Sequence, residues 1–391
     1  MIDYNVNAKT LTFFLNGRIN STNASTVEGE INDVISAQLP ECLIIDCGEL
    51  EYISSAGLRI MLRLRKSYPE FKVVNVSPEV YDIFEMTGFT EMMEVRKAYR
   101  EVSVEGCEII GEGANGKVYR IDGETIVKVY DNSESIDDVQ RERELARKAF
   151  VKGVPTAISY DVVKVGDCYG SVFELLNAKS FASLLIENPS ELDKLTRLFA
   201  ELLKKIHSTV FKAGELPQAK AQTLKRIGLL ESWLPETDYS KLYSLVSAVP
   251  DSCSMIHGDY HLKNIMMQDG EPMLIDMDTI CVGNPIFELG HMYNSLLGYS
   301  DVYRDNVKEF IGIPYETAEE FWNKALKYYL GTNDESVIRT VEKKAKIIGY
   351  SRIMNRFVRH GGMDTPHSRA EIENCRHQFA TLLPQVDELA I

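Results

Sequence analysis

The sequence has 391 residues, more than one hydrophobic core usually organises, so we expect at least two domains. Its formal net charge of −15 argues against a nucleic-acid-binding protein, because such proteins need clustered Lys and Arg to displace the counterions of phosphates. Hydrophobic residues make up 45% of the chain and charged residues 26%, so we do not expect disorder to dominate.

The cysteines and the first residues indicate a compartment. The seven cysteines form no C-x-x-C pair, and an odd number cannot close a complete set of intramolecular disulfides, which predicts reduced thiols. No basic segment followed by an apolar run opens the chain, so no signal peptide is expected. No stretch approaches the roughly 20 apolar residues that a membrane span requires. We therefore expect a cytoplasmic protein without a membrane span.

The first hundred residues alternate between two patterns. Short apolar runs bounded by turn residues predict buried strands at 11–14, 43–46 and 72–76. Apolar residues at helical spacing predict helices at 26–38 and 56–68. A third helix is expected after Ser77, which precedes a proline in the way of a helix cap. This alternation is typical of a small α/β domain.

A run of small residues at 52–58, YISSAGL, leads from a strand into a helix. Together with the strand before it, the segment LNGRI at 15–19 and the segment FEMTGF at 84–89, this run resembles a STAS domain over about residues 1–100. In the anti-sigma-factor antagonists of that family, the serine at this turn is phosphorylated to release a partner. The resemblance therefore implies a protein partner and a possible phosphorylation site at Ser55. Ser54 stands where Asp is usual, and both serines could instead cap the helix.

A second pattern starts after Glu105 with a strand that runs into a glycine-rich turn, IIGEGANGKVY at 109–119. The spacing G-x-G-x-x-G-x-V lets backbone N–H groups approach phosphates, and the valine can lie under an adenine ring. A dinucleotide-binding turn begins similarly but continues into a helix, whereas here a second strand follows at 125–130. The motif residues are Gly111, Gly113, Gly116 and Val118.

Lys128 lies inside that second, apolar strand, where its charge is costly unless an anion matches it. A phosphate and a carboxylate would supply the match. The next helix, at 139–150, offers Glu142 and Glu144, and the register favours Glu142. Alternatively, both are solvated glutamates that make ordinary helical charge pairs.

The strongest motif is IHGDYHLKNI at 256–265, followed by LIDMD at 274–278. Asp259 precedes Asn264 by five positions, the interval between the base and a metal-binding amide in a kinase catalytic loop. Asp276 follows an apolar strand, from which a carboxylate could reach magnesium that bridges phosphates. Each residue by itself could be a cap or turn group, but their joint order after the glycine turn and the lysine argues against that.

Over about residues 106–300 these motifs resemble the aminoglycoside phosphotransferase and choline kinase group of kinase-like enzymes, whose catalytic loop reads H-G-D-x-x-x-x-N. The resemblance implies ATP and Mg²⁺ as cofactors. The implied site consists of Asp259 as base, Asn264 and Asp276 on magnesium, Lys128 on the α- and β-phosphates and Glu142 positioning Lys128. The hinge-like segment VFELLN at 172–177 adds Glu174 and Leu176 to the nucleotide-binding residues. The sequence departs from the family at Leu262-Lys263, where Pro-Gly is frequent, and at Glu288, where Asp is usual.

The substrate side is less well defined. Too few residues separate Asp276 from the next predicted helix start, at Pro285, for a peptide-docking activation segment, which favours a small-molecule hydroxyl acceptor. Protein phosphorylation remains open, because related folds have acquired it with other docking surfaces. The last hundred residues predict helices, among them 321–330 and 337–354, that complete the acceptor pocket. A basic stripe of Arg352, Arg356, Arg359 and His360 could hold an anion, but a solvated helix face is more frequent, so the predicted site omits it.

We therefore predict a chain of mixed α/β and α+β class. A small STAS domain at 1–100 precedes a kinase-like N-lobe at 101–176 and a C-lobe with a helical substrate subdomain at 177–391. The predicted function is ATP-dependent transfer of the γ-phosphate to a hydroxyl of a small molecule, with the STAS domain as a regulatory or protein-interaction module. The alternative is a nucleotide-binding signalling scaffold, or a protein kinase that acts in a partner switch of the STAS and anti-sigma type.

Overall fold

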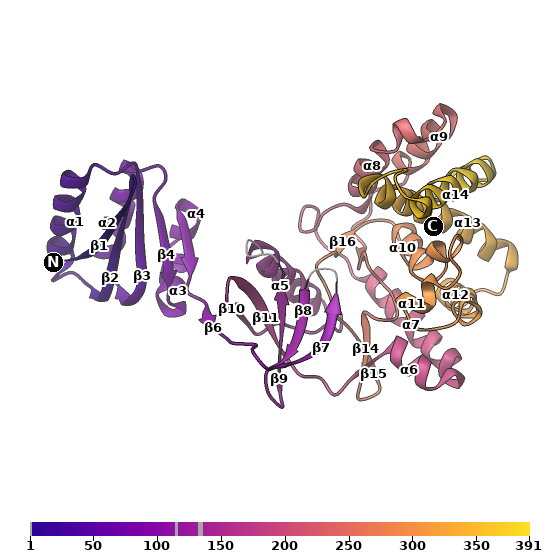
Figure 1. The fold of residues 1–391 in the computed structure, drawn as a ribbon, viewed down its shortest axis with the longest axis horizontal. Helices are drawn as coiled ribbons and strands as arrows, with labels where there is room; N and C mark the ends of the chain where they lie inside the picture. Colours follow the sequence, from indigo (N-terminus) through magenta and orange to yellow (C-terminus); the bar gives the residue numbers. More distant parts are fainter. Residues whose placement is uncertain (1, 114–115, 132–135) are drawn as a thin grey trace. The chain divides into compact units, whose positions relative to one another are not determined.

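The computed structural model describes residues 2–113, 116–131 and 136–391 (Figure 1). The chain divides into two compact units, one comprising residues 1–103 with 162–167 and the other comprising 104–161 with 168–391. Within the described ranges, no helix combines the length and the apolar character needed to cross a membrane. All seven cysteines are free.

The first unit contains a five-stranded sheet in the order β1-β2-β3-β4-β5. β1 pairs with β2 in antiparallel fashion, and the other three pairings are parallel. The strands are β1 (Asp3–Asn7), β2 (Thr10–Ile19), β3 (Cys42–Ile53), β4 (Lys72–Val76) and β5 (Glu94–Lys97). The helices are α1 (Ala24–Gln38), α2 (Ser55–Ser67), α3 (Pro78–Met86) and α4 (Phe89–Met92). The predicted strands and helices of this region are confirmed, and β1, β5 and α4 are additions.

The turn into α2 explains its small residues. Ser54 caps the helix, because its side chain accepts the N–H of Ala56 at 3.2 Å. Ser55 is the first helical residue and is exposed. A Cβ on Gly57 would lie 2.6 Å from Ile53 Cγ1 and 2.9 Å from Ile19 Cγ2, so only glycine lets α2 pack this closely on the sheet.

The second unit begins with four antiparallel strands in the order β11-β9-β8-β7. Residues 114 and 115 of the glycine-rich motif lie outside the described residues. The strands are β7 (Glu108–Gly113), β8 (Gly116–Arg120), β9 (Thr125–Tyr130) and β11 (Cys168–Glu174). Two further strands, β6 (Arg100–Glu101) and β10 (Asp161–Val165), pair in parallel, and all of their residues except Asp161 belong to the first unit. Helix α5 (Ile136–Val151) packs against β11.

The rest of the second unit is mainly helical. Its helices are α6 (Phe181–Glu187), α7 (Leu192–Ser208), α8 (Ala219–Gly228), α9 (Glu236–Ser247), α10 (Ile286–Leu296), α11 (Asn306–Phe310), α12 (Tyr315–Leu330), α13 (Glu335–Arg359) and α14 (Pro366–Leu382), with short 3₁₀ turns at Pro189–Glu191, Glu231–Trp233, Gly298–Ser300 and Leu383–Gln385. Short strands lie among them, namely β12 (Lys179–Ser180), β13 (Met255–Ile256), β14 (Ile265–Gln268), β15 (Glu271–Leu274) and β16 (Cys281–Val282). The two helices predicted near the C-terminus are confirmed within α12 and α13.

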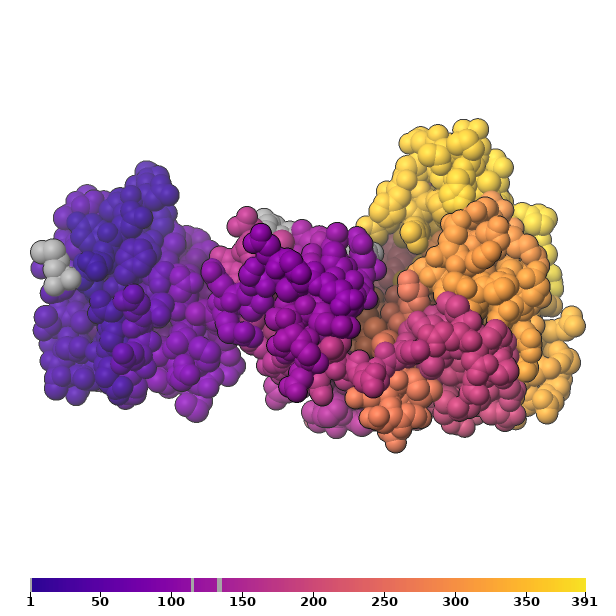
Figure 2. Space-filling model, turned by 60° about the horizontal axis from the view of Figure 1, so that its bottom comes forward, coloured from indigo at the N-terminus to yellow at the C-terminus, as the bar shows by residue number. Residues whose placement is uncertain are grey.

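The helical part has one hydrophobic core, in which α7 packs against α12 and α10 packs against α13. Tyr260, in the loop between β13 and β14, is buried in this core, and its hydroxyl donates to the carbonyl of Phe199 at 2.7 Å. The core therefore fixes the loop that carries the H-G-D motif. Figure 2 shows a recess between the purple strands of this unit and its orange and yellow helices. The predicted lobe boundary near residue 176 stays a prediction.

Candidate active site

Lys128 lies at the centre of a charge cluster in which Glu142 is buried and Lys128 and Asp276 are half-buried. It projects from β9, and its Nζ lies 3.0 Å from both carboxylate oxygens of Glu142 and 2.7 Å from Oδ1 of Asp276. Burial alone would lower the pKa of Lys128, but the charges of Glu142 and Asp276 outweigh it and hold that pKa well above its ordinary value. The ammonium group is therefore charged at every physiological pH.

Helix α5 supplies the carboxylate that the register favoured. Glu142 is buried, and the hydroxyl of Tyr130 also donates to it. Glu144 is exposed and pairs with Lys148 on the same helix at 2.7 Å. Of the two predicted candidates, the structure thus brings Glu142 to Lys128.

Two histidines brace the H-G-D loop. Nδ1 of His257 accepts the N–H of Asp259 at 3.3 Å, and its Nε2 lies 3.3 Å from the carbonyl oxygen of Ile275, which assigns the proton to Nε2. Nδ1 of His261 likewise accepts the N–H of Lys263 at 3.3 Å. The Nε2–H of His261 therefore faces Oδ2 of Asp259, 3.3 Å away.

Asp259 and Asn264 are held together. Nδ2 of Asn264 donates to the backbone carbonyl of Asp259 at 3.0 Å and lies 3.4 Å from its Oδ2. No described residue donates to Oδ1 of Asp259. Burial raises the pKa of Asp259, but the contact with His261 and the charge of Arg352 outweigh burial and hold it well below its ordinary value. Asp259 is therefore an ionised carboxylate whose Oδ1 receives no hydrogen bond from the described residues.

The loop backbone depends on residues that the sequence analysis did not place in the site. Gly258 has φ +85°, and a Cβ there would lie 2.5 Å from the carbonyl oxygen of Thr279, so this position requires glycine. The buried carboxylate of Glu288 accepts the N–H of His257 at 2.5 Å and that of Gly258 at 3.0 Å. Nη1 of Arg352 donates to the carbonyl of Gly258 at 3.0 Å.

The sequence carried only weak signals for these supports. Glu288 was visible as a departure from the family pattern, and Arg352 as one member of a basic stripe. The other members of that stripe, Arg356, Arg359 and His360, are exposed. Lys263 is exposed too, with its Nζ 5.1 Å from the ring centre of Phe310.

The predicted nucleotide-binding residues lie on neighbouring strands. Gly111 and Gly113 lie on β7, whereas Gly116 opens β8 with φ +152°. A Cβ on Gly116 would lie 2.0 Å from the carbonyl oxygen of Val129, so the close approach of β8 and β9 itself demands glycine. Val118 is directly opposite Lys128 in the ladder, and the two side chains therefore share one face of the sheet.

The hinge residues follow β11. Glu174 is its last residue and is exposed, and Leu176 is half-buried two positions later. Between them, the N–H of Leu175 donates to the carbonyl of Glu124 at 2.7 Å. The hinge thus leads from the sheet towards α6, and Leu175 anchors it to Glu124.

Comparisons with known proteins now identify both parts of the chain. The sequence model of the phosphotransferase enzyme family matches residues 106–321. The chain belongs to this phosphotransferase family. The STAS domain model matches residues 1–102. BtrV of Bordetella bronchiseptica, named as a candidate anti-sigma factor antagonist, is 36% identical over 88 residues, which are 21% of this chain and 72% of BtrV. The predicted combination of a STAS domain with a kinase-like domain is therefore confirmed.

Solved structures show the fold of the phosphotransferase. A thermostable mutant of aminoglycoside phosphotransferase APH(4)-Ia in its apo form is 12% identical, with a TM-score of 0.51 over 71% of this chain and 94% of that one. The ternary complex of a thermostable APH(4)-Ia mutant with AMP-PNP and hygromycin B is 11% identical, with a TM-score of 0.50 over 73% of this chain and 95% of that one. The predicted two-lobed kinase-like fold is confirmed.

The phosphotransferase presents a donor set that fits magnesium held jointly with phosphates. Asp276 offers a carboxylate, and the amide oxygen of Asn264 accepts no hydrogen bond from the described residues. Mg²⁺ is commonly bound by one or two such oxygens, completed by phosphates and waters. In the described part of the chain, no group of three or more His, Cys, Asp and Glu side chains is arranged to hold a metal by itself. Burial and the charges of Asp276 and Glu142 raise the pKa of the nearby Asp278 to about 7.

Proposed function

We propose that the second unit transfers the γ-phosphoryl group of ATP to a hydroxyl group of a small molecule. The supporting observation is the cluster of Lys128, Glu142 and Asp276, together with the hydrogen-bonded pair of Asp259 and Asn264. Positioning and charge neutralisation supply most of the catalysis of phosphoryl transfer, and these are what such a set of groups provides.

Each residue has one task in this proposal. The acceptor oxygen bonds to the γ-phosphorus while the bond from that phosphorus to the bridging oxygen breaks, and ADP leaves with the electron pair. Asp259 takes the hydroxyl proton. Its lowered pKa makes it a weak base, which suffices because a loose transition state releases that proton late. Lys128 neutralises charge on the α- and β-phosphates, and Glu142 positions it. Magnesium on Asn264 and Asp276 would supply further charge neutralisation.

The nucleotide-binding proposal extends to the sheet and the hinge. Gly111, Gly113 and Gly116 would bring backbone N–H groups to the phosphates. Val118 would pack against the adenine, because its side chain lies on the same face of the sheet as that of Lys128. Glu174 and Leu176 would contact the base from the hinge. The relative solved with AMP-PNP and hygromycin B supports a nucleotide and a small molecule as the two substrates.

We propose that the STAS domain binds another protein, which the likeness to BtrV supports. The exposed Ser55 at the start of α2 is the proposed phosphorylation site. This serine also supports a second candidate function, in which the chain acts as a signalling scaffold or protein kinase in a partner switch.

One assay separates these functions. The purified full-length chain is incubated with Mg-ATP and a panel of sugars, amino alcohols and aminoglycosides, with ADP formation and phosphorylated acceptors measured by mass spectrometry. Acceptor-dependent ADP formation supports the small-molecule phosphotransferase. ATP binding without turnover on any acceptor would favour the scaffold.

A further inference from the structure

A cavity of about 290 Å³ opens beside the catalytic loop of the second unit. Gly258, the neighbour of Asp259, forms part of its wall, as do Asp278 and Thr279. A group bound there lies next to the proposed base. The volume is at the low end of the roughly 300–1,000 Å³ of small-molecule sites, which suits a compact ligand.

Three arginines from three different helices line this cavity, namely Arg141 of α5, Arg226 of α8 and Arg352 of α13. Arg226 and Arg352 are half-buried. Within the described ranges none of the three forms an ion pair, and the only hydrogen bond from their guanidinium groups is the one from Arg352 to the carbonyl of Gly258.

The two half-buried arginines repel each other. Burial lowers the pKa of Arg226, and the charges of Arg352 and Arg359 lower it further. His291 also lines the cavity. Burial first, and then the charges of Arg352 and Arg226, hold the pKa of His291 well below its ordinary value, so His291 adds no positive charge. Arg352 also interacts electrostatically with Asp259 and Glu288, but neither carboxylate lines the cavity. Guanidinium groups kept together are costly unless an anion binds them, so the cavity side of this pair favours an anionic ligand.

Among the described residues that line the cavity, Asp278 alone carries a carboxylate. A single acidic group does not neutralise three guanidinium groups. The cavity is therefore electropositive, although the whole chain has a net charge of −15. A cluster of positive charge is more informative about a ligand on such an acidic chain than it would be on a basic protein.

We infer that the cavity binds an anionic group of the phosphoryl acceptor, a carboxylate or a phosphate ester, through Arg226 and Arg352. The acceptor is thus a compact hydroxy acid or sugar phosphate and not a polycationic aminoglycoside. The fork of a guanidinium group matches both anions in bidentate fashion. Arg352 connects the proposed anion site to the catalytic loop, because it also donates to the carbonyl of Gly258, the neighbour of Asp259. This inference rests on the proposed function and specifies its acceptor.

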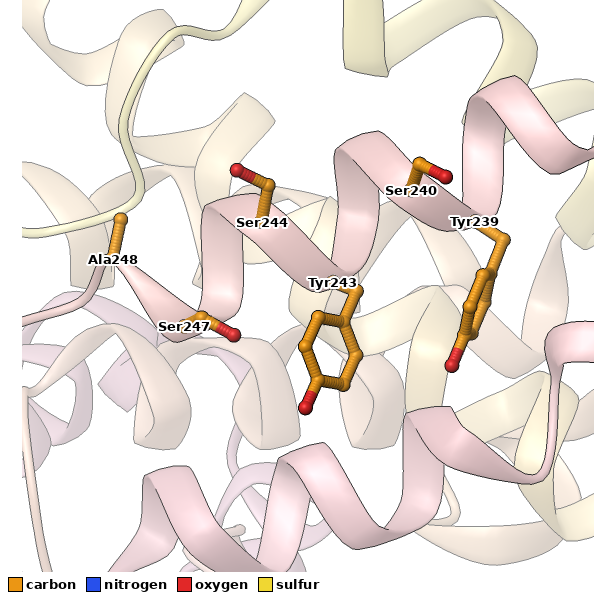
Figure 3. Close-up of a pocket in the computed structure, with 6 residues that line it drawn as sticks. All are labelled: Tyr239, Ser240, Tyr243, Ser244, Ser247 and Ala248. Atoms are coloured by element: carbon orange, nitrogen blue, oxygen red, sulfur yellow. The ribbon is translucent and has the colours of Figure 1, made fainter.

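A second hollow on this unit does not compete for that role. It is lined by Tyr239, Ser240, Tyr243, Ser244 and Ser247 of α9 and by Ala248, which caps that helix, as Figure 3 shows. A site formed by one face of one helix carries no charged group and shares no residue with the catalytic loop.

Binding is tested first, apart from turnover. The affinity of the full-length chain for glycerate, glycerol 3-phosphate, glycerol and kanamycin is measured by titration calorimetry with the nucleotide site filled by AMP-PNP and magnesium. We expect the two anions to bind and the neutral and cationic compounds not to bind. Arg226→Gln should weaken anion binding at least about tenfold, as for a lost charge pair, and Arg226→Lys should weaken it less. Arg356→Gln, an exposed change on α13, is the matched control.

The outcomes separate the inference from the function on which it rests. Anion binding that is equal in Arg226→Gln and wild type, or no anion binding at all, overturns the inference. Turnover of neutral or amino acceptors with a KM that Arg226→Gln leaves unchanged overturns it too, while the phosphotransferase function stands. Arg226-dependent anion binding without phosphoryl transfer to any hydroxy acid or sugar phosphate supports the anion site and contradicts the proposed function. An Arg226→Gln effect on AMP-PNP affinity alone assigns the arginines to the nucleotide and overturns the inference.

Discussion

The ammonium group of Lys128 and the carboxylate of Asp276 lie 2.7 Å apart, although 148 positions separate them in the chain. The pair joins the middle of β9 to the segment that follows β15, and Glu142 closes the cluster from α5. A strand, a helix and a loop are thereby fixed relative to one another by three charged groups within the second unit.

The first prediction compares two glutamates of α5. Glu142→Gln should lower kcat/KM for ATP by about a hundredfold, because Lys128 loses the group that orients it and small displacements of such groups have effects of that size. Glu144→Gln should change kcat/KM by less than twofold, since Glu144 pairs only with Lys148. Steady-state kinetics of both variants check this. Equal effects of the two changes would contradict the role of Glu142.

A second prediction concerns Asp259. Asp259→Asn should reduce kcat by about 10²–10⁴-fold, the range for loss of a general base, and change the ATP dissociation constant by less than about threefold. Single-turnover kinetics and nucleotide titration measure the two quantities separately. Wild-type turnover in this variant would remove Asp259 from the mechanism.

The support of the loop by Glu288 leads to a third prediction. Glu288→Ala leaves the buried N–H groups of His257 and Gly258 without an acceptor, at a cost of about 1–3 kcal/mol each. We expect a lower midpoint temperature for thermal unfolding of the second unit, measured by calorimetry, and a reduced kcat. Glu288→Gln keeps an oxygen for these donors and should recover part of both losses. A midpoint unchanged in Glu288→Ala would show that the backbone finds other partners.

The fourth prediction is a pH dependence that arises at Glu371, a fully buried residue of α14 whose carboxylate oxygens accept no hydrogen bond from the described residues. Burial and then the charge of Asp301 raise its pKa to about 7 from the ordinary 4.5. Cys375 on the same helix also interacts with it, and Nε2 of His367 lies 4.0 Å from Oε1.

The sign follows from the order in which the two states lose the proton. Below pH 4.5 both states are protonated, and between 4.5 and 7 the unfolded chain ionises first, so the free energy of unfolding falls as pH rises. Glu371→Gln should therefore match wild type at pH 4 and exceed it by about 1–2 kcal/mol at pH 8, after allowance for screening. Denaturation at both pH values tests this, with His367→Gln measured alongside to isolate that neighbour. A constant difference across the range would contradict the assignment.

The fifth prediction concerns Ser55. A phosphate there would add roughly −1.5 to −2 charge at the N-terminus of α2, where backbone N–H groups stabilise it, so the STAS domain should stay folded. We expect the phosphate to come from a separate kinase. The purified chain is incubated with labelled ATP and the label is mapped. Label on Ser55 that disappears in Asp259→Asn and does not depend on protein concentration would show transfer within one chain.

The sequence predicted those elements whose signals are local. Strands with buried alternate residues and the H-G-D loop could be recognised from spacing alone. The edge strand β1 could not, because all five of its residues are exposed and only Tyr4 and Val6 alternate with polar residues, too short a pattern to mark a strand. Glu142 could be chosen over Glu144 because one helix has a fixed period.

The arginine-lined cavity was beyond such reasoning. Arg141, Arg226 and Arg352 come from three helices, and no periodicity relates them. Only Arg352 stood out in the sequence, within a stripe whose other members prove to be exposed. Whether three side chains from distant segments meet depends on how their helices pack. Composition and local sequence patterns do not reveal this packing.

Asp276 has φ +62°, a left-handed conformation that a residue with a side chain adopts at a cost of about 1 kcal/mol or more. Glycine would relieve that cost but would also remove the contact with Lys128, so a design that weighs backbone conformation alone should favour Asp276→Gly and yield inactive chains. An aspartate in a left-handed conformation that glycine would adopt more easily indicates that the carboxylate is needed for function. Sequence libraries designed to stabilise this protein should therefore hold residue 276 constant.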